Sequence, residues 1–271
     1  MDPAEEPSPL ETLRGEWESM CRLLGEENPE TLEIAMDLGR AYRQAGEPHQ
    51  ARTLLESIVA SRQKTLGVAH LRTIQAETLL AFTLADLGEL KRSRLIQKGV
   101  LERCDEQFGR QSEQSIAAAM NLANTYRKLK QYPEESPLRT RVLEYRTSLF
   151  GERHIETIKS LAAMAVLKRN QGEFQAAVIL DHAILENIPR SQVSARELLI
   201  FKFNLVNDLM RLKKWSEATK MFDEAYEDAA LHLSPDDNLR RNADRYKSKL
   251  RYMGKADAKT RSRREKSQSR D

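Results

Sequence analysis

The sequence is poor in the residues that build disulfide frameworks, zinc sites and tight turns. Its 271 residues include only two cysteines, Cys21 and Cys104, too few for a cysteine-rich zinc site or a disulfide network, which indicates a reducing compartment. Eleven glycines and nine prolines are too few for an all-β protein. Because long stretches are rich in alanine, leucine, glutamate, arginine and glutamine, which favour helix, we expect an all-α chain.

Targeting and membrane signals are absent as well. No apolar run reaches the roughly 18 residues that a membrane-spanning helix requires. The first nine residues are acidic and proline-rich, which is the opposite of a secretory signal. We therefore expect a cytoplasmic protein, with the nucleus as the alternative location.

Residues with the spacing of a catalytic or metal site are also lacking. No histidine has a second histidine or a cysteine at a metal-binding interval; the five are His49, His70, His154, His182 and His232. The sequence contains no glycine-rich phosphate loop, nucleophile elbow or zinc-protease motif. We predict no enzyme activity, no catalytic residue, no metal and no cofactor.

The formal net charge of +3 comes from one end of the chain. Residues 255–271 hold seven Lys or Arg against three Asp or Glu, a net +4, so the remaining residues sum to about −1. This segment has no apolar periodicity, and we predict a disordered basic tail. Such arms bind nucleic acid or direct nuclear import in some proteins, but the tail lacks an aromatic residue to stack on bases, which argues against specific nucleic-acid recognition.

What the sequence does contain is a repeat of 42 residues. Four glycines recur at this interval, each after an apolar residue: Gly25, Gly67, Gly109 and Gly151. A hydroxyl follows six residues later in every copy, at Thr31, Thr73, Ser115 and Thr157. A large apolar residue and then a small one come next, at Leu38 and Gly39 in the first copy. Three position classes in one register over four copies establish an internal repeat.

Each repeat is predicted to contain two helices. The repeated glycine can adopt the left-handed conformation that ends a helix, and Asn28 followed by Pro29 is typical of an N-cap and a first helical residue. A second break falls at Gly46, Gly88, Lys130 and Gly172. Pro137 lies just inside the helix after the third of these breaks, so we expect that helix to start late or to be distorted. Amphipathic helix pairs must stack on neighbours to bury their apolar faces.

A period of this length also suits HEAT and armadillo repeats, and the residue pattern decides between them. The first repeat resembles the tetratricopeptide repeat in its order of large, small, aromatic and turn residues, at Leu38, Gly39, Tyr42 and Gly46. The leader in residues 66–73 is similar to the Leu-Gly-x-x-His-Pro-x-Thr leader of kinesin light chains. The resemblance covers roughly residues 24–228 and implies an all-α fold, a right-handed α-solenoid of helix-turn-helix repeats.

The predicted organisation has four parts. Residues 1–23 form an N-terminal segment with one packing helix. Five tetratricopeptide-like repeats follow in residues 24–228, at about 24–65, 66–107, 108–149, 150–190 and 191–228. Residues 229–254 form a polar capping helix at the open end, which a solenoid needs to stay soluble, and residues 255–271 are the tail.

The resemblance also implies where such an array binds a partner, because the first helix of each pair lines the concave groove. Transferring the family's partner-contacting positions by register gives these peptide-binding residues: Arg40, Arg43, Phe82, Asn121, Asn124, Arg127, Lys128, Lys159, Arg169, Asn204, Asn207 and Arg211. Asparagine is a poor helix former, and an amide can both donate to and accept from an extended peptide backbone. The four asparagines are therefore expected to hold a peptide, although neighbouring helices could instead satisfy Asn124 and Asn207.

The groove positions carry more cations than acids, which predicts a preference for an acidic or phosphorylated segment. The alternative is that these charges are simply a solvated helix face. Phe82, Met120, Phe203 and Met210 are expected to supply pockets for apolar side chains of the segment. The predicted function is a non-catalytic protein–protein adaptor or scaffold. The alternatives are a self-associating structural subunit and a nucleic-acid-associated factor that uses the basic tail.

Overall fold

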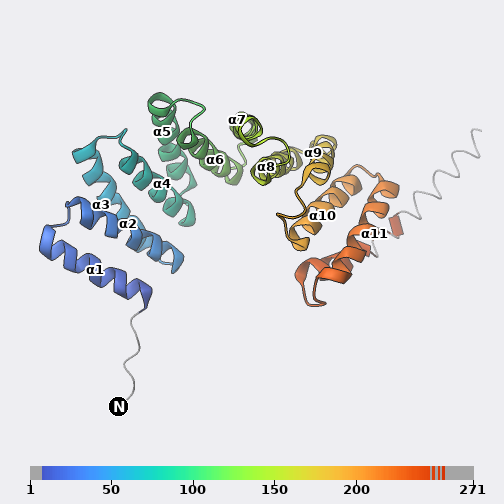
Figure 1. Cartoon of the computed structure of the whole chain (residues 1–271), viewed down its shortest axis with the longest axis horizontal. Coiled ribbons are helices and arrows are strands. Elements are labelled where there is room, and N and C mark those ends of the chain that lie inside the picture. Colours follow the sequence, from blue (N-terminus) through green and yellow to red (C-terminus); the bar gives the residue numbers. More distant parts are fainter. Residues whose placement is uncertain (1–7, 245, 248–249, 251, 254–271) are drawn as a thin grey trace, which may run out of the picture. The chain divides into compact units, whose positions relative to one another are not determined.

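The computed structural model describes residues 8–244, 246–247, 250 and 252–253. These residues form α-helices joined by short loops, with no strand among them, which confirms the predicted all-α solenoid of helix pairs. The chain divides into two compact units, residues 1–138 and 139–271, and the division falls inside one helix (Figure 1). The predicted tail, residues 255–271, lies outside the described residues.

Unit 1 holds the N-terminal helix and the first repeats. Its helices are α1 (Pro9–Leu24), α2 (Pro29–Gln44), α3 (Pro48–Leu66), α4 (Leu71–Asp86), α5 (Leu90–Phe108), α6 (Glu113–Lys128) and the start of α7 (Tyr132–Phe150). Each helix from α1 to α5 packs on the next one along the chain. The helix predicted in residues 1–23 is α1.

Unit 2 holds the later repeats. Its helices after α7 are α8 (Ile155–Gln171), α9 (Phe174–Asn187), α10 (Ala195–Arg211) and α11 (Trp215–His232). Helix continues from residue 238 as far as it is described, and Ala243 and Leu250 from this segment are buried in the core of unit 2. The capping helix predicted for residues 229–254 therefore begins later than expected, because α11 runs on to His232.

The loop before each repeat has the same construction in four places. Gly25, Gly67 and Gly109 have φ of 86–88° and ψ of 151–162°. Positive φ was expected, but this ψ lies outside the left-handed helical region, in a region that is essentially open only to glycine. The next helix is then capped by a side chain at the same position in every repeat, for example by His70 Nδ1, which accepts from the Arg72 N–H at 3.2 Å.

The repeated hydroxyl ties this loop to the preceding helix. Thr73 is fully buried and its hydroxyl donates to the carbonyl of Gly67 at 2.8 Å. Thr157 makes the same bond to Gly151 at 2.8 Å. The bond to the glycine carbonyl thus recurs in the second and fourth repeats, while the Ser115 hydroxyl of the third repeat donates to Asp105.

The second loop of each repeat turns through a residue with positive φ. Gly46, Gly88 and Gly172 have φ of 78–80°, while the matching position in the third repeat is Lys130, with φ of 57°. The helix that follows Lys130 is α7, and it begins at Tyr132 with Pro137 inside it. The expectation of a late start was wrong, because α7 begins in the same register as α3 and α5.

The helices of a pair meet through small residues, and large apolar residues fill the space on either side. Ala51, Ala81 and Ala123 are fully buried at the crossings. Leu55 and Ile58 on α3 are almost completely buried and pack with residues of α2 and α4. Each such side chain stabilises the stack by about 1.5–3 kcal/mol, so adjacent repeats hold one another in register.

Candidate functional site

The first helices of the repeats in unit 1 carry seven of the predicted groove residues. We call the exposed surface of α2, α4 and α6 that contains them the unit 1 face; they are Arg40, Arg43, Phe82, Asn121, Asn124, Arg127 and Lys128. These helices follow one another at 42-residue intervals, so the same turns of each helix present their side chains in a row.

Two of the predicted cations of this face already have acidic partners. Arg40 pairs with Asp37 on its own helix at 2.5 Å. Arg43 reaches from α2 to Asp86 on α4 at 2.7 Å, and its guanidinium carbon lies 5.5 Å from the centre of the Phe82 ring. These contacts neutralise the N-terminal part of the face and tie two repeats together, so the positive charge predicted here is smaller than the count of arginines suggests.

Helix α6 is different. Asn121 is half-buried, and its side chain makes no hydrogen bond within the part of the chain that the structure describes. Arg127 and Lys128 lie about two turns further along the same helix and likewise have no acidic partner among the described residues. Asn124 differs from its neighbour, because its side chain is engaged in an intramolecular contact. The free amide and the two free cations leave α6 with polar groups that a ligand can use.

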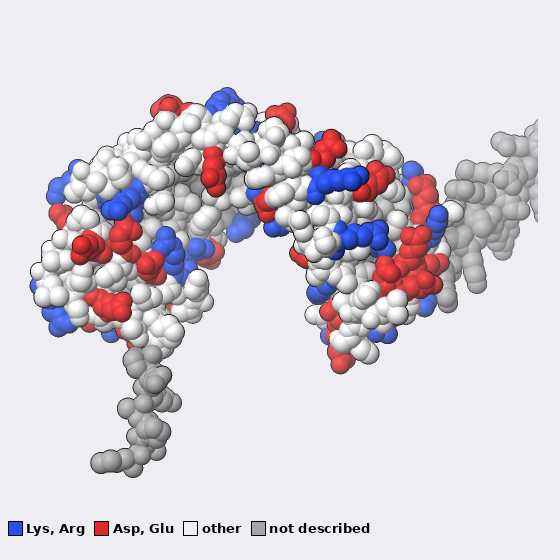
Figure 2. Space-filling model, viewed as in Figure 1, with Lys and Arg blue, Asp and Glu red and all other residues white. Residues whose placement is uncertain are grey.

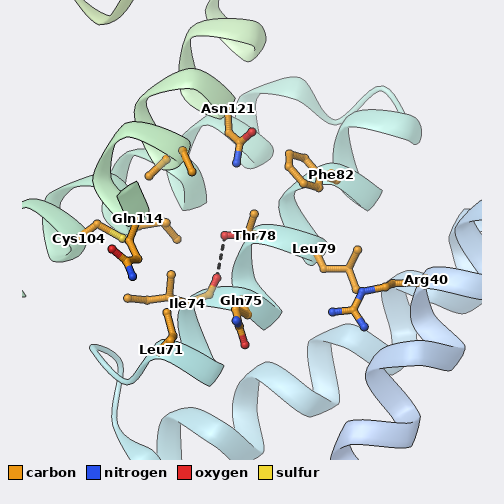
Figure 3. A pocket seen from close by; sticks show the side chains of 13 residues that line it. Arg40, Leu71, Ile74, Gln75, Thr78, Leu79, Phe82, Cys104, Gln114 and Asn121 are labelled. Carbon is orange, nitrogen blue, oxygen red and sulfur yellow. Dashed lines mark hydrogen bonds between the residues drawn. The ribbon is translucent and has the colours of Figure 1, made fainter. Parts of the chain in front are cut away.

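An apolar pocket opens beside Asn121. It has a volume of about 340 Å³ and lies between α4 and α6, with α5 contributing to its floor. Ile74, Val100 and Cys104 form buried parts of the wall, while Phe82 lies at the rim. Figure 3 shows the Asn121 amide directed toward the space and Gln114 close to Cys104. Phe82 was predicted as a contact residue, but the pocket itself was not predicted.

Unit 2 carries the other five predicted residues, and their settings differ. Lys159 is exposed and pairs with Glu156 one turn earlier at 2.8 Å. Asn207 and Arg211 line a second pocket, of about 400 Å³, whose wall includes Trp215 and Tyr246. Asn204 is half-buried on the same helix. Phe203 is buried in the core of this unit, so the expectation that it offers a pocket to a ligand was wrong, whereas Met210, although mostly buried, lines the second pocket.

Arg169 lies within a buried ion cluster. Its Nη2 donates to Asp181 on α9 at 2.6 Å, and its Nε donates to Asp208 on α10 at 2.6 Å. Both carboxylates are almost completely buried, at 1% and 2% exposure. Burial raises the pKa of Asp181 to about 6 and also raises the pKa of Asp208, because one guanidinium cannot compensate for two desolvated carboxylates. Arg169 thus links three helices.

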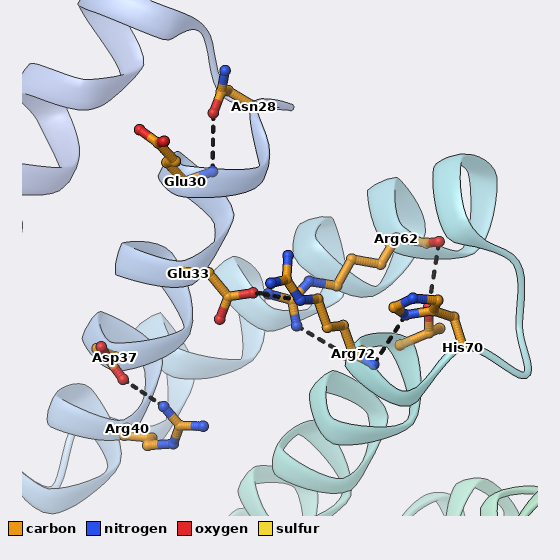
Figure 4. A network of polar contacts seen from close by, with 9 residues as sticks. Asn28, Glu30, Glu33, Asp37, Arg40, Arg62, His70 and Arg72 are labelled. Carbon is orange, nitrogen blue, oxygen red and sulfur yellow. Dashed lines mark hydrogen bonds and ion pairs between the residues drawn. The ribbon is translucent and has the colours of Figure 1, made fainter.

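The burial of Arg62 was not predicted at all. Arg62 on α3 is 2% exposed; it donates to the Arg72 carbonyl at 2.9 Å and pairs with Glu33 at 2.9 Å (Figure 4). Arg146 repeats the arrangement 84 residues later and donates to the Glu156 carbonyl at 3.1 Å. The sequence signal was available, because the two arginines share one register, but a lone arginine on an amphipathic helix is usually assigned to the surface.

Charges of both signs are interspersed on the visible surface of each unit (Figure 2). Within the described residues, no cluster of three or more histidine, cysteine or acidic side chains is placed to hold a metal ion. The search of those residues for a helix with the length and hydropathy of a membrane span found none. Both cysteines are free thiols, and burial raises the pKa of Cys104.

The comparisons with known proteins agree with this architecture. The family model described as Tetratricopeptide repeat matches residues 31–72 and 115–156. BtubC (BKLC) from P. vanneervenii superposes with a TM-score of 0.67 at 17% identity, over 86% of this chain and 97% of its own. A kinesin-light-chain candidate with nearly identical TPR-like repeats from Podosopora anserina gives 0.68 at 21% identity, over 77% of this chain and 100% of its own.

Among curated proteins, the chain is similar to the Clustered mitochondria protein homolog of Candida albicans, with 22% identity over 212 residues, or 78% of this chain. The homolog from Meyerozyma guilliermondii is 24% identical over 227 residues, or 81% of this chain. The chain spans about one sixth of the length of these relatives.

Stacked helix pairs with this loop chemistry define the class of fold: the chain contains tetratricopeptide repeats at the matched residues within an α-solenoid, a fold that generally serves as an interaction scaffold. The solved structures that share this fold include kinesin-light-chain-like repeat proteins.

Proposed function

We propose that the chain is a non-catalytic adaptor that holds a partner protein by an extended, acidic segment laid along the unit 1 face. The observation that carries the proposal is the set of unused polar groups on α6, where the Asn121 amide and the cations of Arg127 and Lys128 have no partner among the described residues. Unused groups of this kind are available to a ligand without breaking an existing contact.

The asparagine side chain suits an extended backbone. Its carbonyl oxygen accepts from a peptide N–H and its NH₂ group donates to a peptide carbonyl, so one residue can hold a segment without reading its side chains. Asn121 is half-buried beside the pocket, which lowers the competition from water for these bonds.

The preference for an acidic segment rests on α6 rather than on the whole face. Arg40 and Arg43 are occupied by Asp37 and Asp86, so their charge is largely compensated. The free cations Arg127 and Lys128 remain to attract a carboxylate or a phosphate on the segment. The surface of α10 with Asn204, Asn207 and Arg211 is proposed as a second, separate contact area in unit 2.

The remaining predicted properties form part of the same proposal. The five-repeat organisation of residues 24–228 is supported by helix pairs that recur in register. A cytoplasmic location is supported by two cysteines that are both free thiols.

The proposal is tested with a displayed library of random peptides and the full chain as bait. We expect the wild type to enrich acidic peptides. Asn121→Ala should weaken the enriched peptides about tenfold, which corresponds to one lost buried hydrogen bond. Replacing Arg127 and Lys128 by alanine should remove the acidic enrichment. Lys98→Ala, an exposed change on the second helix of its pair, is the matched control and should bind like the wild type.

Two results would contradict the proposal. One is that no peptide is enriched above the background of an unrelated helical protein. The other is that the enriched peptides bind Asn121→Ala and the wild type with equal affinity, which would place them elsewhere on the chain. Circular dichroism on each variant verifies that the helices are intact before binding is compared.

A further inference from the structure

The pocket beside Asn121 lies where one repeat departs from its neighbours. Arg62, Cys104 and Arg146 occupy the same position in three successive repeats, 42 residues apart. All three point inward, and Arg62 and Cys104 are 2% and 1% exposed. Cysteine is the smallest of the three side chains, and Cys104 lines the pocket.

The two arginines show what usually fills this space. Arg62 donates to the carbonyl of Arg72, in the first turn of the following helix, and Arg146 donates to the carbonyl of Glu156, at the same place in its own repeat. Each also forms an ion pair with a glutamate. The residue equivalent to Arg72 and Glu156 in the third repeat is Gln114, and Gln114 lines the pocket. The space beside Cys104 therefore corresponds to the volume that a guanidinium takes elsewhere.

We infer that Cys104 is a specificity-determining residue, because its small side chain leaves a pocket that admits one large apolar side chain of the segment bound along the unit 1 face. This inference rests on the proposed function and adds what the segment must contain. A volume of about 340 Å³ is at the lower end of the range for ligand pockets, about 300–1,000 Å³, which suits a single side chain.

The pocket walls agree with an apolar occupant. Ile74, Leu79 and Val100 are buried at 5%, 7% and 3% exposure and form much of the inner wall. Thr78 uses its hydroxyl internally, as a donor to the Ile74 carbonyl at 2.8 Å, so it presents little polarity to the pocket. The amides of Gln114 and Asn121 lie at the boundary, where the backbone of the segment would run (Figure 3).

The position of the free cations gives the spacing within the segment. Asn121 and Lys128 are two turns apart on α6, which is about 10 Å along the helix. An extended chain covers that distance in about three residues. The segment is therefore one that carries a large apolar residue and an acidic residue about three or four positions away.

The first experiment fills the pocket with an arginine–glutamate pair that already exists at the equivalent position of the first repeat. Glu33 pairs with Arg62, and the equivalent of Glu33 one repeat later is Gln75, so the double variant Gln75→Glu, Cys104→Arg reproduces the neighbouring junction. The matched control is Gln75→Glu, Cys104→Ala, which carries the same new acid and leaves the pocket open. Ala117→Phe closes the pocket with a neutral side chain from an exposed position on α6 and does not depend on the new ion pair.

The variants are measured against peptides enriched by the wild type, each also made with its apolar residue replaced by alanine. Loss of that residue should weaken binding to the wild type and to the open control about 10- to 100-fold. Replacing the apolar residue of the peptide should have almost no effect on binding to the two variants with a closed pocket, because these variants already bind the original peptide weakly. If removing the apolar residue costs as much in the closed variants as in the wild type, the side chain does not enter this pocket and the inference fails.

A second experiment needs no peptide and separates the inference from the proposed function. Benzene, a probe that enters apolar cavities, is soaked into crystals of the full chain. Electron density for benzene beside Cys104 is expected in the wild type and in the open control, and not in Ala117→Phe. Absence of benzene from the wild-type pocket overturns the inference even if peptides bind the unit 1 face. Loss of peptide binding in Asn121→Ala tests the proposed function alone.

Discussion

Replacing Asp181 by asparagine tests whether the buried cluster around Arg169 is stabilised or strained by its second negative charge. Asp181 and Asp208 share one guanidinium and face each other closely enough for the neutral form of Asp181 to donate to Asp208. Asparagine keeps the shape of the protonated carboxyl: its oxygen can accept from Arg169 and its NH₂ group can donate to Asp208. The substitution therefore removes the charge and retains the hydrogen bonds.

The expected effect depends on pH in a defined direction. Burial raises the folded-state pKa of Asp181 from its ordinary value of 3.8 to about 6. A carboxyl with a raised pKa binds its proton more tightly when the protein is folded, so its contribution to stability is present below pH 3.8 and is lost as the pH rises through about 6. Between about pH 5 and about pH 7.5 the loss is on the order of 1 kcal/mol. The asparagine variant does not titrate, so it should gain about this much relative to the wild type across the same interval.

Urea unfolding followed by circular dichroism at the two pH values measures the difference. Asp181→Ala is the control, because it removes both the charge and the hydrogen bonds and leaves Asp208 and Arg169 with an unfilled space; it should be destabilised at either pH. The reasoning is refuted if Asp181→Asn is destabilised equally at the two pH values, since the ionised carboxylate would then be a net stabilising partner of Arg169.

Two further predictions compare equivalent positions within the chain. Lys130→Gly should raise the free energy of unfolding by about 0.5–1 kcal/mol because glycine adopts the positive φ at this position without strain. Gly88→Ala should lower the free energy of unfolding by a similar amount for the opposite reason. A Lys130→Gly variant with the same thermal unfolding midpoint as the wild type would contradict this. Thr73→Val should lower the free energy of unfolding by about 0.5–1.5 kcal/mol in urea because it removes the hydrogen bond that the Thr73 hydroxyl donates to the Gly67 carbonyl. Thr31→Val should cost almost nothing, since the buried Thr31 hydroxyl has no partner within the described part of the chain; equal costs would show that the bond to Gly67 is not the reason.

Most of the fold was predictable because the residues that repeat every 42 positions are those with strict backbone and hydrogen-bonding requirements. The leader glycines need positive φ, the following caps need a side-chain acceptor, and the hydroxyl at Thr73 needs a carbonyl, so these positions resist substitution and the register is visible. The boundary at Pro137 was mispredicted because α7 begins at Tyr132 and continues through Pro137, which as the sixth residue removes one hydrogen bond to residue i−4 without displacing the start of the helix.

The candidate site was less predictable because register alone does not reveal which charges are already satisfied. Leu55 in the first repeat corresponds to Gln97, Arg139 and Asp181 in the next three, and all four positions are buried. The sequence shows polar residues at a core position, but their partners come from other helices, as Arg169 and Asp208 do for Asp181. For the same reason the pocket beside Cys104 was not predicted, because it arises where a small side chain occupies a position that holds an arginine in the neighbouring repeats.

The arginines at 43, 127 and 169 show how this array distributes binding capacity. They occupy one register, and on sequence alone all three are equivalent groove cations. Arg43 is compensated by Asp86 on the following first helix and Arg169 by Asp208. The position that corresponds to Asp86 for Arg127 holds Asn170, which carries no charge. Removing the acid that compensates Arg43, by Asp86→Asn, should therefore raise the affinity for acidic peptides without touching Asn121 or the pocket, and an unchanged affinity would mean that a free cation at this register position does not contribute its charge to binding.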